Sequence, residues 1–194
     1  MINSNYGKYE VPETLRKIIS LQKNLDEQGK LPYGDLLGLY FSVDEIDRRY
    51  LNTPLDVISL AWPGMDGIHY GFLTDFGLVK DLEQAYIIRV SPMDFDDPVK
   101  IVARNIRDFL RLLCYYPSAV ELLHSGVTEK IEEMDVPAIP VEGDLRKLVV
   151  ETFQLEQIQD VWEYFSTVRS ERLNAIVVET NDGIGVVGND GVHE

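Results

Sequence analysis

The sequence is poor in the residues that carry most metal and redox chemistry. It contains one cysteine, Cys114, and three histidines among 194 residues. A single cysteine excludes an intramolecular disulfide, and this set cannot form a closed zinc site of standard spacing. Because Cys114 falls within an apolar stretch of helical pattern, we expect it to be a buried structural thiol.

Basic residues are also scarce compared with acidic ones. Lys and Arg together number 18, against 33 Asp and Glu, which gives a formal net charge of −15. A charge of this size repels phosphate backbones and anionic membrane surfaces, and so argues against a nucleic-acid or membrane-surface role. It favours a basic protein partner, although solubility alone would also explain it.

Long hydrophobic runs are missing as well. No apolar segment approaches the roughly 20 residues that a membrane-spanning helix needs. The first five residues are polar and have no apolar core of a secretory signal, so we expect a cytoplasmic protein. Hydrophobic residues nevertheless make up 45% of the chain, which is enough for one sizeable buried core.

Three short motifs match functional signatures but lack the required context. Residues 183–188 match G-x-G-x-x-G, yet no helix that could hold a pyrophosphate follows them in this sequence. Residues 75–77 match the kinase D-F-G without its companion segments, so Asp75 is expected to stabilise a turn. The acidic loop of Asp94, Asp96 and Asp97 is a weak cation candidate, with helix capping as its more ordinary role. The sequence predicts no metal site and no cofactor.

Two strands near the middle of the chain organise the predicted fold. Residues 55–62 (LDVISLAW) have the pattern of a strand, and residues 68–73 alternate in the period of a strand with two distinct faces. Met65-Asp66-Gly67 between them favours a tight turn, because Asp-Gly accepts positive φ. This pattern predicts a hairpin at the centre of an antiparallel sheet, and residues 85–90 supply a third strand.

Helical patterns flank these strands. Residues 10–27 predict a first helix, and residues 98–115 predict the strongest one, with Asp97 as its N-cap and Pro98 in its first turn. Between them we expect irregular structure with some strand at 31–41, a short helix at 42–49, and a connection with a weak strand at 77–83.

The C-terminal part predicts further helices and a terminal hairpin. We expect helices over 117–124, 144–157 and 160–169, and strands over 175–180 and 184–188. Two prolines within residues 137–140 suggest a boundary between a domain of residues 1–136 and an extension of residues 137–194, which packs on the same core in one alternative. The predicted fold class is α+β: a central antiparallel sheet covered by helices on one face, with a C-terminal helical and β-hairpin extension.

Candidate binding residues fall into two groups. Five belong to the central hairpin region, and of these His69 is expected on a face turned to solvent or to a partner. Three arginines, with Lys100 before them, form a basic stripe at helical spacing, for which the alternatives are a solvated helix face or a contact with the chain's own acidic C-terminal part. The eight candidates are Trp62, Asp66, His69, Tyr70, Asp75, Arg104, Arg107 and Arg111.

The pattern of the central region resembles that of the Smi1/Knr4 (SUKH) superfamily. The resemblance rests on residues 64–75 (GMDGIHYGFLTD), 87–92 (IIRVSP) and 102–110 (VARNIRDFL), and covers about residues 30–115. It implies an α+β domain with a protein-binding role, because bacterial members resemble immunity proteins that neutralise toxins and fungal relatives act as regulatory hubs. No residue-level site transfers, since the binding surfaces of the family vary.

Three functions are consistent with these observations. The leading hypothesis is a non-enzymatic protein-binding module of SUKH type, an immunity or regulatory protein whose partner is a basic toxin domain. The second is a small-molecule enzyme with a dispersed site around His69, Tyr70, Asp66 and Asp75, and a filled core there would remove it. The third is a structural subunit that self-associates through its C-terminal part. The sequence does not specify an oligomeric state.

Overall fold

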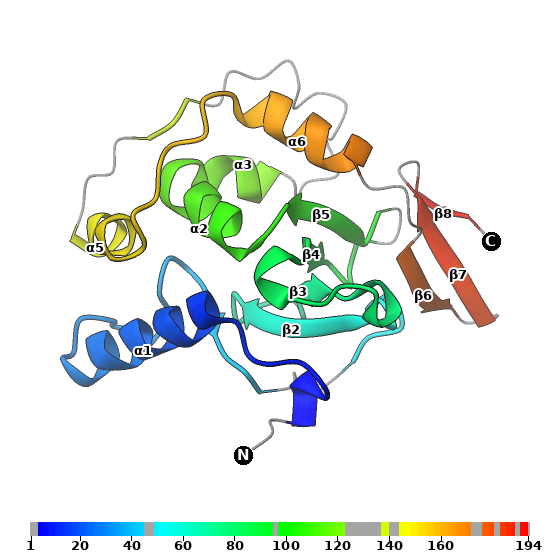
Figure 1. The fold of residues 1–194 in the computed structure, drawn as a ribbon, viewed down its shortest axis with the longest axis horizontal. Helices are drawn as coiled ribbons and strands as arrows, with labels where there is room; N and C mark the ends of the chain where they lie inside the picture. Colours follow the sequence, from blue (N-terminus) through cyan, green and yellow to red (C-terminus); the bar gives the residue numbers. More distant parts are fainter. Residues whose placement is uncertain are drawn as a thin grey trace.

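A five-stranded antiparallel sheet forms the centre of this α+β protein in the computed structural model (Figure 1). The described residues are 4–44, 49–94, 97–122, 137–139, 144–171, 176–180, 183–188 and 191–193. Strand order in the sheet follows the chain, and each strand is antiparallel to the next. The strands are β1 (Tyr40–Phe41), β2 (Val57–Trp62), β3 (His69–Leu73), β4 (Ile87–Val90) and β5 (Val99–Ala103).

The predicted central hairpin is confirmed as β2 and β3. Ile58 lies opposite Phe72 and Ser59 opposite Gly71, and Asp66 and Gly67 in the turn have φ values of 52° and 69°. Gly71 is needed for close approach, because a Cβ there would lie 2.4 Å from Cγ2 of Val57. The third predicted strand is also present, as β4.

The prediction of one helix over residues 98–115 is wrong in its first third. Residues 99–103 form β5, which pairs with β4, and helix α2 (Ile106–Tyr115) begins only after Asn105. The Asn105 side chain, rather than that of Asp97, accepts the hydrogen bond from Asp108 N at 2.9 Å. Val99, Val102 and Ala103 fit helical spacing, but Val99, Ile101 and Ala103 also recur every second residue. Pairing with β4 decides for the strand, in which the β-branched Val and Ile side chains pack well.

The remaining helices are α1 (Glu13–Glu27), α3 (Pro117–Leu122), α5 (Asp144–Phe153) and α6 (Val161–Glu171). Short 3₁₀ turns lie at η1 (Ser4–Tyr6), η2 (Asp75–Gly77) and η3 (Leu82–Gln84). The last two replace the weak strand expected within residues 77–83. The short helix expected at 42–49 falls mostly on residues 45–48, which lie outside the described residues.

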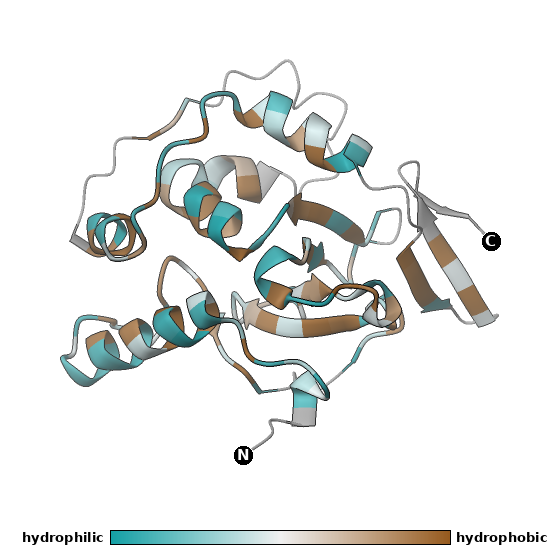
Figure 2. Cartoon of the chain, viewed as in Figure 1, coloured by the Kyte–Doolittle hydropathy of each residue, from teal (hydrophilic) through white to brown (hydrophobic). Residues whose placement is uncertain are grey.

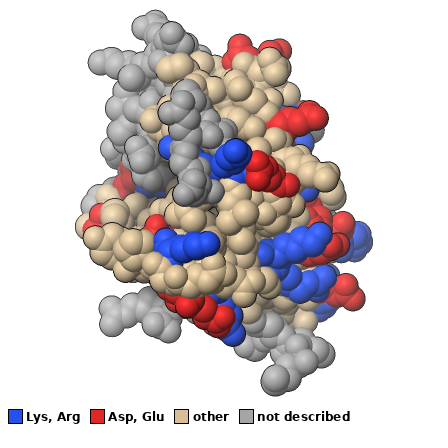
Figure 3. All heavy atoms as spheres, turned by 90° about the vertical axis from the view of Figure 1, so that its left-hand side faces the viewer, with Lys and Arg blue, Asp and Glu red and all other residues tan. Residues whose placement is uncertain are grey.

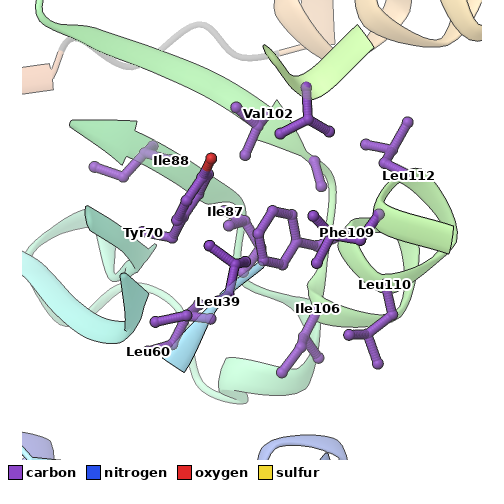
Figure 4. Packing of buried hydrophobic residues seen from close by; sticks show 14 of the residues in the cluster. Leu39, Leu60, Tyr70, Ile87, Ile88, Val102, Ile106, Phe109, Leu110 and Leu112 are labelled. Carbon is purple, nitrogen blue, oxygen red and sulfur yellow. The ribbon is translucent and has the colours of Figure 1, made fainter. Parts of the chain in front are cut away.

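Helix α2 covers one face of the sheet. Its Phe109 side chain points from the helix toward Tyr70 and Ile87 of the sheet, and the rings of Phe109 and Tyr70 have centroids 4.9 Å apart (Figure 4). Ile106, Leu110 and Leu112 of the same helix are fully buried. Brown, apolar residues line the inner sides of the helices and strands (Figure 2), as expected when an amphipathic helix buries its apolar face against a sheet.

The first residues and the C-terminal strands are joined to the region around β2 by hydrogen bonds. Tyr6 OH donates to Ser59 O at 3.4 Å, so η1 lies against β2. Strands β6 (Ile176–Thr180), β7 (Gly183–Gly188) and β8 (Gly191–His193) form a second antiparallel sheet. Two backbone hydrogen bonds join β6 to the segment before β2: Leu55 N donates to Val177 O, and Glu179 N donates to Leu51 O, each at 3.0 Å.

The segment after residue 137 contributes to the same hydrophobic core as the sheet. Val149 of α5 and Val168 of α6 are fully buried, and Val178 of β6 is almost fully buried, in one continuous cluster with the sheet residues. Among the helices of the described residues, none is long and apolar enough to cross a membrane.

Candidate functional site

The two ring residues of the predicted binding hairpin belong to the protein interior. His69 and Tyr70 are 0% and 2% exposed, so the expectation that His69 faces solvent or a partner is wrong. The strand does have two faces, but residues 50–53 cover the one that carries His69. Its Nδ1 lies 2.8 Å from Gly67 O, its Nε2 lies 3.3 Å from Thr53 Oγ1, and its ring stacks on Tyr50. Burial is the main cause that lowers the pKa of His69.

The other three hairpin candidates do not converge on one place. Trp62 is half-buried at the end of β2 and stacks on Tyr40, and Asp66 is exposed in the turn between β2 and β3. Asp75 follows the opposite end of β3, in η2. A dispersed catalytic site around His69, Tyr70, Asp66 and Asp75 therefore has a packed interior at its centre instead of a cleft.

The basic stripe is divided between β5, the link that follows it and α2. Lys100 lies in β5 and is 5% exposed, with its Nζ 3.4 Å from Asp94 and 3.6 Å from Asp97. Asp94 and Asp97 of the predicted acidic loop thus form ion pairs with Lys100, whereas Asp96 lies outside the described residues. Within the described residues, no group of three or more His, Cys, Asp or Glu side chains has the arrangement of a metal site.

The three arginines of the stripe bind the C-terminal part of the same chain. Arg104 forms a two-fold hydrogen bond with the Glu171 carboxylate, each branch 2.9 Å long. Arg107 donates to Phe153 O at 2.7 Å, and Arg111 donates to Glu156 O at 2.6 Å. The alternative explanation, a contact with the chain's own C-terminal part, is the one that the structure supports. We call Arg104, Arg107 and Arg111 the arginine clamp.

A polar cavity of about 370 Å³ adjoins the clamp. Its polar side chains already serve the fold: Glu83 accepts from Thr14 N at the start of α1, Arg111 pairs with Asp108 at 2.8 Å, and Tyr164 OH donates to Asp108. The polar side chains around this cavity therefore connect neighbouring elements of the fold. Its lining residues are Glu83, Gln84, Asn105, Arg107, Asp108, Arg111, Gln154, Leu155 and Glu156.

A second, larger cavity is the better candidate for a ligand site. It has a volume of about 580 Å³, within the range of small-molecule sites, and its walls are mainly apolar. We call it the apolar groove. Three segments line it: the chain after α1, the end of α2 with the start of α3, and the start of α5. The lining residues are Leu31, Pro32, Tyr33, Asp35, Leu37, Gly38, Leu113, Pro117, Ile139, Leu145 and Arg146.

A tight turn shapes one wall of the groove. Leu36 and Leu39 are joined by two backbone hydrogen bonds, and Leu37 and Gly38 between them have φ values of 59° and 78°. Two successive positive φ values are typical of a type I′ turn, in which Asn-Gly is the favoured pair. Leucine adopts this conformation at a cost in free energy, so Leu37 is locally strained.

The groove contains one cation in its apolar wall. Arg146 is half-buried, and its Nη1 is closed off from solvent and has no hydrogen-bond partner among the described residues. The nearby thiol of Cys114 is fully buried, and burial raises its pKa to about 12, so the thiol stays neutral beside this guanidinium. The expected burial of Cys114 is confirmed.

The eight sequence-predicted candidates do not line the apolar groove. Comparison with protein-family models, with curated proteins and with solved structures finds no match to this chain. The resemblance to the SUKH superfamily therefore stays a prediction, and what the fold itself defines is an α+β protein with a consecutive five-stranded antiparallel sheet.

Proposed function

We propose that the chain is a non-enzymatic protein-binding module of SUKH type, located in the cytoplasm, that neutralises or regulates a basic partner such as a toxin domain. The main support is the use of the arginine clamp. Its three cations are engaged with the C-terminal part of the chain, so the residues that suggested an acidic partner are already occupied. The net charge of −15 therefore favours association with a basic surface of a partner.

The chemistry of the interior also supports binding over catalysis. Both ring nitrogens of His69 lie within hydrogen-bond distance of other groups of the fold, and the Cys114 thiol is buried and uncharged. A general base must reach a substrate proton, and a nucleophilic cysteine must be a thiolate near the surface. Neither condition is met by these two residues.

The test is binding to toxin domains encoded beside the gene for this chain. We expect one of them to form a stable complex, measured by calorimetry, whose affinity falls steeply as salt increases because association is electrostatic. The matched control is an unrelated basic protein whose net charge equals that of the toxin domain. It should bind the chain far more weakly than the toxin domain does. Lack of any complex, together with turnover of a small molecule, would contradict the proposal.

Self-association is a second candidate that one observation favours. Ile184 and Val186 are 72% and 39% exposed and lie two residues apart on the same face of β7. A second copy of the chain could cover this apolar face. Light scattering after gel filtration decides between a monomer of 22.1 kDa and a species of twice that mass.

A further inference from the structure

We propose that the apolar groove binds a small molecule that combines an apolar body with a carboxylate. The volume of about 580 Å³ and the predominantly apolar lining fit a compact organic ligand. This site is independent of the proposed protein partner, because it uses neither the arginine clamp nor the net charge of the molecule.

The apolar body lies against the leucines and Ile139 that line the groove. Leu31 and Leu113 are almost completely buried, whereas Leu37, Ile139 and Leu145 remain partly accessible. A ligand that covers the accessible three removes their apolar surface from water, which is favourable in proportion to the area covered. Figure 3 shows tan surface, which belongs to residues other than Lys, Arg, Asp and Glu, between the charged side chains of one side of the molecule.

Arg146 selects the carboxylate. Its Nη1 has lost contact with water and has gained no acceptor from the residues that the structure describes, which is an unfavourable state for a guanidinium. Arginine is long and rotatable, and its planar head matches a carboxylate in a two-fold hydrogen bond. Asp35 is the acid among the lining residues, and its Oδ2 accepts from Gly38 N at 3.1 Å, so it serves the turn and would repel a ligand anion toward Arg146.

The strained turn gives a separate indication of a site. An Asn-Gly pair would form the turn at Leu36–Leu39 without the strain that leucine introduces. Residues kept in such conformations cluster at binding sites. Leu37 is both the strained residue and a lining residue of the groove, and its side chain supplies apolar contact that Asn would not.

The experiment compares 4-phenylbutyrate with 4-phenylbutyramide, which has the same apolar body without the charge. Binding to the full chain is followed by NMR of methyl-labelled leucines at physiological ionic strength. We expect shifts of leucine methyl signals and an affinity for the carboxylate about tenfold above that for the amide. Equal affinities, or no binding of either compound at millimolar concentration, would overturn the proposal.

Two variants assign the effect to the groove. Arg146→Gln should remove the preference for the carboxylate, whereas Lys147→Gln, which deletes the same charge from an exposed neighbour on α5, should keep it. Leu37→Asn should weaken binding of both compounds severalfold while thermal stability is maintained or raised. Loss of the preference in Lys147→Gln, or unchanged affinity in Leu37→Asn, would contradict the assigned contacts.

Discussion

His69 ties the stability of the fold to pH. Because burial lowers its pKa, the folded protein holds the imidazole neutral at a pH where the unfolded chain already takes up a proton. Stability is therefore fully present above the unfolded pKa of about 6.5 and is lost as the pH falls below it. We expect the free energy of unfolding to decrease from about pH 7 to pH 5, with a smaller decrease in His69→Gln.

Urea denaturation at several pH values measures this difference. The raised pKa of Asp97 gives a slope of opposite sign, since burial disfavours its charged form. That slope is common to wild type and variant and cancels in the comparison. Equal pH dependence in the two proteins would mean that His69 is not held neutral.

Arg89 is the largest fully buried side chain of the described residues, at 2% exposed. Its side chain has a hydrogen bond with Tyr70, but its Nε and Nη1 have no partner within the described part of the chain. Burial lowers its pKa to about 10, against the opposing influence of Tyr70 and Asp94. Replacing a poorly compensated buried charge by an apolar side chain of similar length is often stabilising by about 1–4 kcal/mol. We expect Arg89→Met to unfold at a higher urea concentration than wild type.

Lys100→Met is the matched comparison, because Lys100 lies directly opposite Arg89 in the sheet. It removes the cation that pairs with Asp94 and Asp97, so we expect it to lower stability. If Arg89→Met were the more destabilised of the two, the buried charge of Arg89 would be better compensated than its two unpartnered nitrogens indicate.

The arginine clamp holds two helices that the chain reaches only after α2. Each contact is partly exposed and is worth about 1 kcal/mol or less. Changing Arg104, Arg107 and Arg111 together to methionine should therefore loosen the C-terminal helices without unfolding the sheet. We expect amide hydrogen exchange in α5 and α6 to become roughly tenfold faster or more, with little change in β2 to β4.

A triple change of Arg16, Lys17 and Lys23 on α1 is the control for lost charge. These residues are exposed, and among the described residues Lys17 and Lys23 form ion pairs with glutamates of the same helix. Faster exchange in α5 and α6 of the control, or uniform change throughout the clamp variant, would contradict the clamp.

Elements whose signals are local were predictable from the sequence. The β2–β3 hairpin followed from alternation and an Asp-Gly turn. Helix α1 followed from apolar spacing, with its end at Glu27 as predicted and its start at Glu13 instead of residue 10. Residues 99–103 failed because their apolar positions fit both the strand period and the helix period, and only pairing with β4 decides between them. The role of the arginine clamp was foreseen only as one of several alternatives.

The apolar groove had no local signal. Its lining comes from residues 31–38, 113–117 and 139–146, and no pattern within any one segment shows that the three meet. The strain at Leu37 is likewise set by the two hydrogen bonds between Leu36 and Leu39. A leucine-glycine pair in the sequence does not predict that this turn forms. Burial of His69 depends on residues 50–53. The alternation of residues within its own strand therefore could not predict it.

The charge of the whole molecule predicts a response to salt. With a net charge of −15 the acidic groups repel one another in the compact state, and salt screens this repulsion. We expect the melting temperature to rise as sodium chloride increases from low to physiological ionic strength, by about 2–4 °C for each kcal/mol gained.

Tetramethylammonium chloride separates screening from binding of a particular cation. Equal gains with the two salts indicate screening, whereas a gain with sodium alone would point to a specific ion site. A melting temperature that falls with salt would show that attractive ion pairs outweigh the acidic repulsion.

The hydrogen bonds between β6 and residues 51–55 have a consequence for biosynthesis. Leu55 is joined to Val177 and Leu51 to Glu179. The peptide groups of residues 51 and 55 therefore cannot form these hydrogen bonds until more than a hundred further residues have been synthesised. During that interval these peptide groups are unpaired, and the incompletely folded chain is suited to capture by chaperones. Mutations that weaken β6 should therefore reduce the yield of the protein in cells more than they reduce its stability in the test tube.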